Sequence, residues 1–213
     1  MKIPKHIGII PDGNRRWAVS HGLTKDKGYN AGINPGFILF KQCEKFGIKE
    51  LTFYGFTVDN TKRPSVQKEA FIKACIDAVD CLKSEDVEIL VIGNTASPCF
   101  PKELLPYTKP TKFGTGKTRV NFLINYGWKW DLYSLKTANR NRKNITNNIR
   151  SNNISRIDLI IRWGGRRRLS GFLPVQSVYS DFYIIDRYWP DFSPTDLEEA
   201  LEWYNTQDIT LGG

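Results

Sequence analysis

The sequence lacks any apolar run approaching the roughly 18–20 residues that a membrane-spanning helix needs. Its first residues, Met1 to His6, contain no apolar core of a secretory signal peptide. The four cysteines form no CxxC pair and the chain has only two histidines, so we expect no zinc site. These scarcities predict a cytoplasmic protein with reduced thiols.

Acidic side chains are also in short supply, with 22 Asp and Glu against 31 Lys and Arg, which leaves a net charge of +9. Such an excess suits a nucleic acid, an anionic membrane surface or a polyphosphate ligand. The sequence contains no recognised nucleic-acid motif, and its arginines gather where predicted strands end. We therefore expect no nucleic-acid partner and at most a peripheral contact with membranes.

The 213 residues, 40% of them hydrophobic, suit one globular domain over residues 1–213. Short β-branched runs predict six strands, at residues 7–10, 51–56, 87–93, 119–125, 157–162 and 182–185. Helical spacing predicts helices at 31–46, 65–84, 128–139 and 195–204, with Ser65 and Ser193 as N-caps. The alternation predicts an α/β fold with a mostly parallel six-stranded sheet flanked by helices, and loops at 95–118 and 139–153.

The first predicted strand ends in the most informative segment, IGIIPDGNRRW, from Ile7 to Trp17. In open α/β sheets, ligands bind beyond the carboxyl ends of the strands, where helix N-termini point their N–H groups. Asp12 at this exit can hold Mg²⁺ through its carboxylate, and Arg15 and Arg16 can hold phosphate oxygens. The segment therefore predicts a magnesium–diphosphate site.

A second basic loop, RWGGRRRLS from Arg162 to Ser170, follows the fifth predicted strand. Its glycines let backbone N–H groups approach an anion, and its arginines suit forked contacts with phosphate. The segment GTGKT at 114–118 looks like a nucleotide-binding loop, but Thr111 stands where the first glycine belongs and a strand follows rather than precedes it. We therefore expect an anion site in the loop from Arg162 to Ser170 and no nucleotide site at 114–118.

Taken together, these motifs resemble those of the cis-prenyltransferases, a family that includes undecaprenyl diphosphate synthase. The resemblance runs nearly end to end with a shortened middle. Its motifs extend from His6 to Trp17, Tyr54 to Pro64, Asn125 to Gly127 and Ile157 to Leu173, with Tyr179 and 189–192 also fitting. It implies a parallel sheet with surrounding helices, a hydrophobic tunnel for the prenyl chain, Mg²⁺ as cofactor and a homodimer.

The resemblance also implies roles for individual residues. Catalytic positions are matched by Asp12, Asn60 and Arg63. Mg²⁺ ligands are matched by Asp12 and by Asp181, which stands where the family has a glutamate. Substrate-binding positions are matched by Gly13, Asn14, Arg15, Arg16, Trp17, Tyr29, Thr57, Arg162, Arg168 and Ser170.

Departures from the family pattern gather on the side of the second substrate. Tyr29 replaces a histidine, Arg166 a glutamate, Thr61 a tryptophan and Thr57 a serine. The last residues, 208–213, lack the arginines of the family's Arg-x-Gly ending. This pattern is similar to that of the irregular lavandulyl and cyclolavandulyl diphosphate synthases, which join two dimethylallyl diphosphates head-to-middle.

The sequence thus predicts a Mg²⁺-dependent prenyl diphosphate synthase that releases diphosphate and forms a lavandulyl-type product. Its expected substrate is dimethylallyl diphosphate, with isopentenyl and geranyl diphosphate as further candidates. Two alternatives stay open at this stage. One is ordinary cis head-to-tail elongation of an allylic diphosphate with isopentenyl diphosphate, and the other is one subunit of a heteromeric cis-prenyltransferase.

Overall fold

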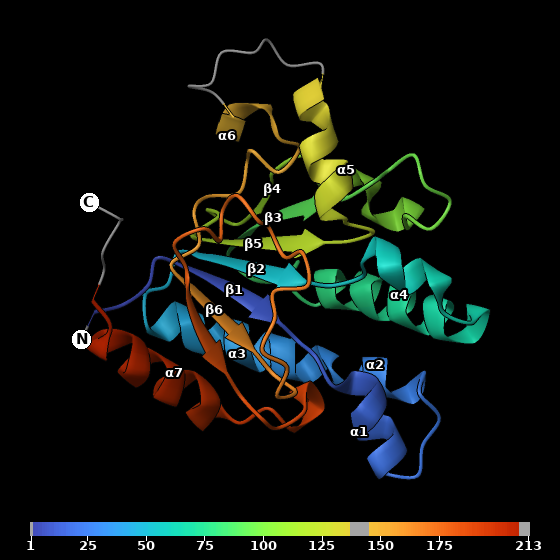
Figure 1. The fold of residues 1–213 in the computed structure, drawn as a ribbon, viewed down its shortest axis with the longest axis horizontal. Coiled ribbons are helices and arrows are strands. Elements are labelled where there is room, and N and C mark those ends of the chain that lie inside the picture. The colour runs from blue at the N-terminus through green and yellow to red at the C-terminus, as the bar shows by residue number, and fades with distance from the viewer. Residues whose placement is uncertain (1, 137–144, 209–213) are drawn as a thin grey trace.

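The computed structural model describes residues 2–136 and 145–208. Their centre is a seven-stranded sheet in the order β4-β3-β5-β2-β1-β6-β7 (Figure 1). All neighbouring strands are parallel except β3 and β4, so the mostly parallel α/β sheet is confirmed. The strands are β1 (His6–Ile10), β2 (Glu50–Tyr54), β3 (Val87–Ile92), β4 (Thr111–Phe113), β5 (Thr118–Leu123), β6 (Leu159–Arg162) and β7 (Asp181–Ile184).

Helices connect these strands and cover the sheet unequally. The α-helices are α1 (Asn14–Ser20), α2 (Lys27–Ala31), α3 (Ile33–Lys45), α4 (Ser65–Asp80), α5 (Trp128–Tyr133), α6 (Ile145–Asn148) and α7 (Pro194–Thr206). Short 3₁₀ turns are η1 (Val58–Lys62), η2 (Lys102–Thr108), η3 (Ser134–Lys136) and η5 (Trp189–Asp191). Within the described residues, no helix is both long and apolar enough to cross a bilayer.

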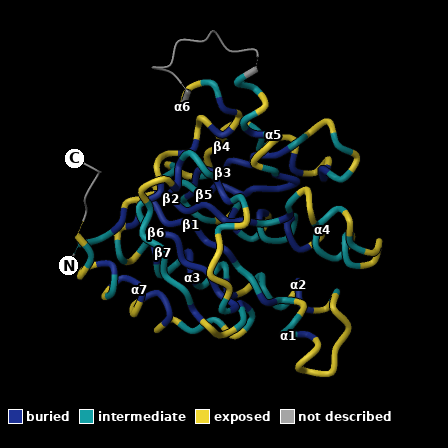
Figure 2. The backbone as a smooth tube through the Cα atoms, viewed as in Figure 1, coloured by how far each residue is buried: buried dark blue, intermediate teal, exposed yellow. Residues whose placement is uncertain are grey.

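Two hydrophobic cores lie on the two faces of the sheet. The larger core packs α3, α4 and α7 against one face, where alternate strand residues such as Ile7, Ile9 and Phe122 point. The smaller core takes the opposite alternation, such as Ile10 and Ile160, and is closed mainly by loop residues rather than by long helices. Figure 2 shows the strands as the most deeply buried part of the backbone. The continuous apolar runs of the sequence follow from this burial on both faces.

The seventh strand, β4, was not expected, because it falls in the segment 95–118 that was predicted as a loop. It has three residues, and Lys112 in its middle is exposed, so it carries no apolar signal of its own. It forms because its backbone pairs with the edge of β3, where Thr111 lies opposite Ile89. Such an edge strand depends on pairing with a distant segment, which the local pattern of hydrophobic residues does not predict.

The helix ends differ from the expectation at some positions. Ser193 caps α7 as predicted, in a capping box with Asp196. Ser65 is instead the first residue of α4, because the extended Pro64 takes the cap position. The predicted loop 139–153 contains α6, and its residues 139–144 lie outside the described part of the chain.

The GTGKT segment has a structural explanation in Asp86. One carboxylate oxygen of Asp86 accepts the backbone N–H groups of Thr115 at 2.7 Å, Gly116 at 2.8 Å and Lys117 at 3.3 Å. Successive N–H groups of this kind form an anion-binding concavity. Here a carboxylate of the chain itself occupies the place that a phosphate takes in a nucleotide-binding loop.

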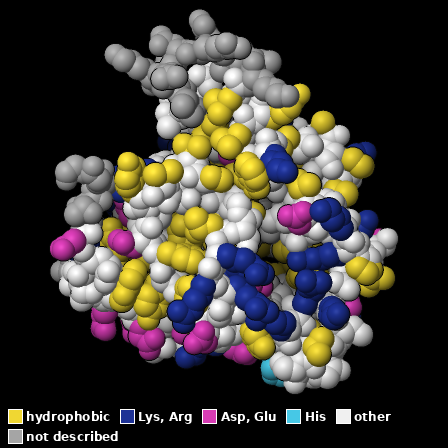
Figure 3. Space-filling view, viewed as in Figure 1, with side chains coloured by type: hydrophobic (Ala, Val, Ile, Leu, Met, Phe, Trp, Pro, Cys, Tyr) yellow, Lys and Arg dark blue, Asp and Glu magenta, His cyan; other side chains and the backbone are white. Residues whose placement is uncertain are grey.

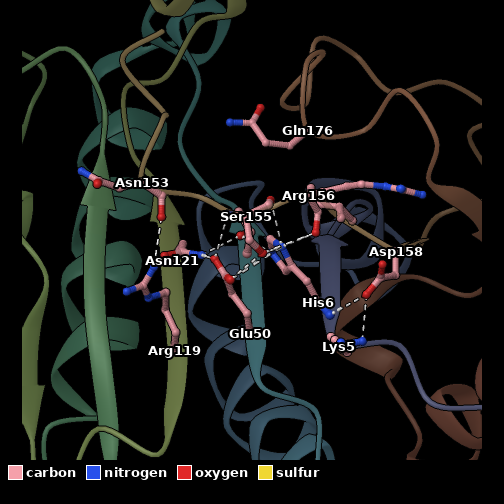
Figure 4. A network of polar contacts seen from close by, with 12 residues as sticks. Lys5, His6, Glu50, Arg119, Asn121, Asn153, Ser155, Arg156, Asp158 and Gln176 are labelled. Carbon is pink, nitrogen blue, oxygen red and sulfur yellow. Dashed lines mark hydrogen bonds and ion pairs between the residues drawn. The ribbon is translucent and has the colours of Figure 1, made fainter. Parts of the chain in front are cut away.

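A buried polar network connects β1, β2 and β5 near the amino-terminal ends of these strands (Figure 4). His6 is 1% exposed, and its Nε2 lies 2.8 Å from the hydroxyl of Thr52, which also accepts Asn121 Nδ2 at 3.0 Å. Nδ1 lies 3.2 Å from the carbonyl oxygens of both Ser155 and Arg156, which can only accept, so in a neutral ring the proton resides on Nδ1 and Nε2 accepts from the hydroxyl of Thr52. Burial lowers the pKa of His6, against the raising effect of the Glu50 carboxylate, so the folded protein holds a neutral ring.

This neutral ring predicts a loss of stability on mild acidification. Because the folded-state pKa is lowered, the unfolded chain binds a proton first as pH falls through about 6.5, and the free energy of unfolding then falls by up to about 1.4 kcal/mol per pH unit. Urea titrations at pH 7.5 and 5.5 measure the difference. His6→Gln should reduce that difference, whereas His21→Gln, at the other and exposed histidine, should leave it unchanged. Equal wild-type stability at the two pH values would contradict a buried neutral His6.

Candidate active site

A deep cleft opens at the carboxyl edge of the sheet, where the segments after β1, β2, β6 and β7 meet. It encloses about 920 Å³, a volume typical of small-molecule sites. In Figure 3, Lys and Arg side chains gather around a hollow on this face. The strand order creates the site: β1 lies between β2 and β6, and Ile10 at the end of β1 pairs with Arg162 at the end of β6. Ligands of open α/β sheets bind at such an edge.

Asp12 lies at the centre of the cleft, directly after β1. Its Oδ1 accepts the backbone N–H of Gly13 at 2.6 Å. Its Oδ2 lies 2.8 Å from Arg162 Nη2 and 3.5 Å from Arg16 Nη2. Burial raises the pKa of Asp12, but the hydrogen bond from Arg162 and the charges of Arg162 and Arg16 outweigh it and lower the pKa overall. Asp12 is therefore an ionised carboxylate, held in place by two arginines.

Arg162 joins Asp12 to the basic loop that follows β6. Its side chain is 5% exposed, and its Nη1 donates to the carbonyl oxygen of Arg168 and, at 3.2 Å, to the hydroxyl of Ser170. The hydroxyl of Tyr54 donates to the carbonyl oxygen of Ser170 at 2.9 Å and fixes that residue at φ 54°, an unusual conformation for a serine. Arg162 Nε is buried without a partner among the described residues. One buried guanidinium thus connects the segment after β1 to the loop after β6.

The glycines of this loop permit close packing against α1. A Cβ on Gly164 would lie 2.5 Å from Arg16 Nη2 and 3.1 Å from the carbonyl oxygen of Asp12, and its φ is +84°. Only glycine fits this space and this conformation. The guanidinium of Arg16 also lies 5.0 Å from the ring of Tyr188, so Arg16 is fixed between a glycine and an aromatic ring.

The opposite side of the cleft is built around Tyr29 and Arg63. Arg63 Nη1 donates to the hydroxyl of Tyr29 at 2.8 Å, and the Tyr29 ring stacks on Phe71 with centroids 4.5 Å apart. Burial raises the pKa of Tyr29, and burial together with the nearby charge of Arg15 lowers the pKa of Arg63. Because the Tyr29 oxygen accepts this bond, its own hydrogen is free to donate to a ligand.

Asn60 positions the turn after β2. Its Oδ1 accepts the backbone N–H of Thr57 at 2.9 Å, and the Thr57 side chain accepts the N–H of Asn60 in return. This reciprocal pair shapes η1 along the rim of the cleft. The amide nitrogen of Asn60 is the group that this arrangement leaves for a ligand.

A second, apolar pocket of about 80 Å³ adjoins the cleft. Its wall is formed largely by α3, α4, β2 and β5. Four phenylalanines line it, Phe37, Phe53, Phe71 and Phe122, and the rings of Phe53 and Phe122 stack at 5.5 Å. The pocket and the cleft share five lining residues, Pro11, Asn14, Tyr29, Gly55 and Phe71. A ligand can therefore place a charged head in the cleft and an apolar group in the pocket.

The structure brings most of the predicted site residues into the cleft lining. These are Asp12, Gly13, Asn14, Arg15, Arg16, Tyr29, Thr57, Asn60, Arg63, Arg162, Arg168 and Ser170.

Two of the predicted residues do not lie in the lining. The indole N–H of Trp17 donates to Asp191 at 2.6 Å, and this hydrogen bond links α1 to η5. Asp181 begins β7 opposite Leu159, whereas Arg162 pairs with Ile184 three residues later. At about 3.3 Å per residue, Asp181 is about 10 Å from the end of the strand that faces the cleft. Asp181 therefore lies at the end of β7 that is away from the cleft, and its role as a Mg²⁺ ligand stays a prediction.

Other lining residues were not predicted from the sequence, above all the pocket wall formed by α4 and the turn after it: Phe71, Ala74, Cys75, Ala78 and Leu82. Their spacing of three and four residues is the same as that of ordinary core positions, so the pattern does not distinguish a pocket wall from a core.

The residues around Asp12 fit a magnesium ion held jointly with a substrate. Mg²⁺ commonly binds through one or two carboxylates and the phosphate oxygens of a substrate. Asp12 supplies one carboxylate at the centre of the cleft. The described residues contain no cluster of three His, Cys, Asp or Glu that could hold a metal by themselves. The remaining ligands would have to come from a diphosphate and from water.

Comparison with protein families matches residues 10–212 to the prenyltransferase family described as undecaprenyl diphosphate synthase. An isoprenyl transferase of Clostridium perfringens is 33% identical over 239 aligned positions, which cover 100% of this chain and 91% of the relative. A ditrans,polycis-undecaprenyl-diphosphate synthase, specific for (2E,6E)-farnesyl diphosphate, of Aliivibrio fischeri is 31% identical, with 99% and 89% covered.

Among solved structures, the lavandulyl diphosphate synthase of Lavandula x intermedia, crystallised with dimethylallyl diphosphate, superimposes with a TM-score of 0.84. The match covers 99% of this chain and 98% of the other, at 23% identity. At that identity the likeness establishes the shared fold, which confirms the fold expected from the sequence.

Proposed function

The chain belongs to the undecaprenyl diphosphate synthase family of prenyltransferases, and from that premise we propose that it joins two molecules of dimethylallyl diphosphate head-to-middle. The activity of a prenyl diphosphate synthase follows from the family. The identity of the substrates and the way they are joined are the finer part of the proposal.

The small apolar pocket beside a cationic cleft is the observation that carries the proposal. An apolar cavity of about 150 Å³ holds one benzene molecule. A pocket of about 80 Å³ that opens into the cleft is smaller than that, so it suits a short apolar group rather than a chain of tens of carbons. A single condensation of two five-carbon units agrees with this size.

The reaction breaks the bond between C1 and the diphosphate oxygen of one substrate and forms a bond from C1 to C2 of the other. The resulting tertiary cation loses a proton from a methyl group, and the released diphosphate is the base available to take it. The negative charge that grows on the leaving oxygens is stabilised by three cations, Arg15, Arg16 and Arg63. The phenylalanines of the pocket keep water away from the cation. Mg²⁺, when bound beside Asp12, would add electrophilic stabilisation of the departing diphosphate.

The side of the second substrate supports head-to-middle joining. Arg166 lines the cleft where chain-elongating relatives are expected to carry a glutamate, and Tyr29 replaces an expected histidine. Arg166 alters how the second diphosphate is held, whereas Tyr29 lies beside Arg63 on the side of the first substrate. A displaced diphosphate would bring C2 rather than C4 of the second substrate to the allylic cation, because bond formation follows the carbon that is held nearest.

Ordinary cis head-to-tail elongation is the second candidate, and the names of the relatives favour it. The relatives at 31–33% identity are called isoprenyl transferase and undecaprenyl-diphosphate synthase.

We also propose a homodimer, with a heteromer as its alternative. Residues 209–213, where the family's Arg-x-Gly ending is expected, lie outside the described part of the chain.

Product analysis tests the proposal. The purified chain is incubated with Mg²⁺ and dimethylallyl diphosphate, with and without isopentenyl diphosphate, and the dephosphorylated product is examined by mass spectrometry and NMR. We expect a branched ten-carbon alcohol from dimethylallyl diphosphate alone. A linear cis-prenol formed only with isopentenyl diphosphate would establish the second candidate. Activity that appears only with a partner subunit would establish the heteromer.

A further inference from the structure

The lining of the cleft carries a surplus of positive charge, and the binding of one magnesium ion beside Asp12 gives no reason for that surplus. Its lining contains seven cations, Arg15, Arg16, Lys25, Arg63, Arg162, Arg166 and Arg168, and two carboxylates, Asp12 and Asp59. The Asp59 side chain is 84% exposed and pairs with Lys62 at 3.0 Å, so it faces solvent. Asp12 is the carboxylate that remains at the centre, and two arginines already surround it.

Five of these cations form two groups on the two sides of Asp12, and Arg16 pairs with Asp12 itself at 3.5 Å. Arg15 and Arg63 lie close enough for their charges to interact, beside Tyr29 and the apolar pocket. Arg162, Arg166 and Arg168 follow β6 on one glycine loop, with the Ser170 hydroxyl 3.2 Å from Arg162 Nη1. The buried Nε of Arg162 has no partner in the part of the chain that the structure describes. The second group therefore offers several N–H donors and one hydroxyl to a single anion.

The second group contains no carboxylate of its own. Asp186 approaches the loop behind Gly165 and does not belong to the cleft lining. Mg²⁺ requires oxygen ligands in near-octahedral geometry, and carboxylates normally supply the protein's share of them. A guanidinium repels a divalent cation instead. The residues that follow β6 thus fit a diphosphate directly and do not fit a diphosphate bound through magnesium.

Charge balance leads to the same result. A prenyl diphosphate carries about three negative charges near neutral pH, because the last ionisation of a phosphate has a pKa near 6. Seven cations less two carboxylates leave five positive charges in the lining. The protein alone therefore neutralises most of the charge of two diphosphates.

We propose that Arg162, Arg166 and Arg168 bind the diphosphate of the second substrate without a divalent cation. Magnesium is then needed beside Asp12 for turnover and not for binding of the second diphosphate. This inference rests on the proposed function, since it assigns the second diphosphate site of the same reaction. Arg166 takes over the electrostatic role of a metal ion at that site.

Calorimetric titration with inorganic pyrophosphate in EDTA and 0.15 M salt tests the inference. We expect the wild-type chain to bind two pyrophosphate molecules in the absence of divalent metal. Arg166→Glu should weaken one of the two binding events by about 10–150-fold. This is the loss of affinity expected when a charge-assisted hydrogen bond is removed. Arg167→Glu is the matched control, because it makes the same charge change at an exposed neighbour outside the cleft lining, and we expect less than a threefold effect.

Two results would overturn the inference. One is a wild-type chain whose second pyrophosphate binds only after Mg²⁺ is added. The other is an equal loss of affinity in Arg166→Glu and Arg167→Glu, which would mean that net charge and not the position of Arg166 governs binding. Failure of the proposed function is separately visible, because product analysis in Mg²⁺ would then give no prenyl product from the wild-type chain even where two pyrophosphates bind in EDTA.

Discussion

Asp12→Asn is expected to reduce turnover by on the order of 10³-fold while leaving the fold intact. Asparagine has the shape of aspartate and still accepts the N–H of Gly13, so the backbone at the end of β1 keeps its hydrogen bond. What disappears is the negative charge that would hold a magnesium ion beside the leaving diphosphate. The measurement is kcat with saturating dimethylallyl diphosphate over a range of Mg²⁺ concentrations, together with thermal unfolding to verify the fold.

Asp59→Asn is the matched control for this experiment. Asp59 also lines the cleft, but its exposed carboxylate pairs with Lys62 at the rim. Neutralising it removes the same charge without touching the centre, and we expect turnover within about threefold of wild type. Activity of Asp12→Asn close to that of the wild-type chain, or wild-type activity that persists in EDTA, would contradict a mechanism that depends on magnesium beside Asp12.

The sequence predicted where Asp12 lies, but not which side chains surround it. A strand that ends in Pro-Asp-Gly places a carboxylate at the carboxyl edge of a sheet by a local rule. The contact between Asp12 and Arg162, 150 residues apart, depends on which strand lies beside β1 and in which register. Strand order arises from the packing of the whole chain, so the sequence predicted two anion-binding loops but not that one guanidinium connects them.

Two assignments carried over from motif resemblance illustrate a different limit. Trp17 belongs to the motif around Asp12, yet the helical turn of α1 directs its indole to Asp191 rather than into the cleft. Asp181 stands before the apolar run at 182–185, and the start of a parallel strand lies at the opposite edge from its end. Position within a motif does not specify the side of a helix or the end of a strand.

Arg162→Lys is expected to lower kcat/KM by roughly 10²–10³-fold and the free energy of unfolding by about 2–3 kcal/mol. Lysine keeps the charge, but one ammonium group on a flexible stem does not bridge Asp12, the carbonyl oxygen of Arg168 and the Ser170 hydroxyl together. The loop after β6 then loses its buried anchor and the second substrate loses a forked donor. Steady-state kinetics and urea titration measure the two effects, and Arg156→Lys makes the same chemical change at an exposed position away from the cleft.

The pH dependence of Arg162→Met separates an electrostatic role of Arg162 from a purely structural one. Burial alone raises the pKa of Asp12, and in the wild-type chain the hydrogen bond and the charge of Arg162 reverse that effect. Without the guanidinium the folded-state pKa of Asp12 rises, so Asp12 takes up a proton at a higher pH. The acidic limb of the kcat/KM profile is therefore expected to move to higher pH, whereas a variant that only loosened the loop would lower the profile without moving that limb. An unmoved limb in Arg162→Met would mean that Arg162 does not keep Asp12 ionised.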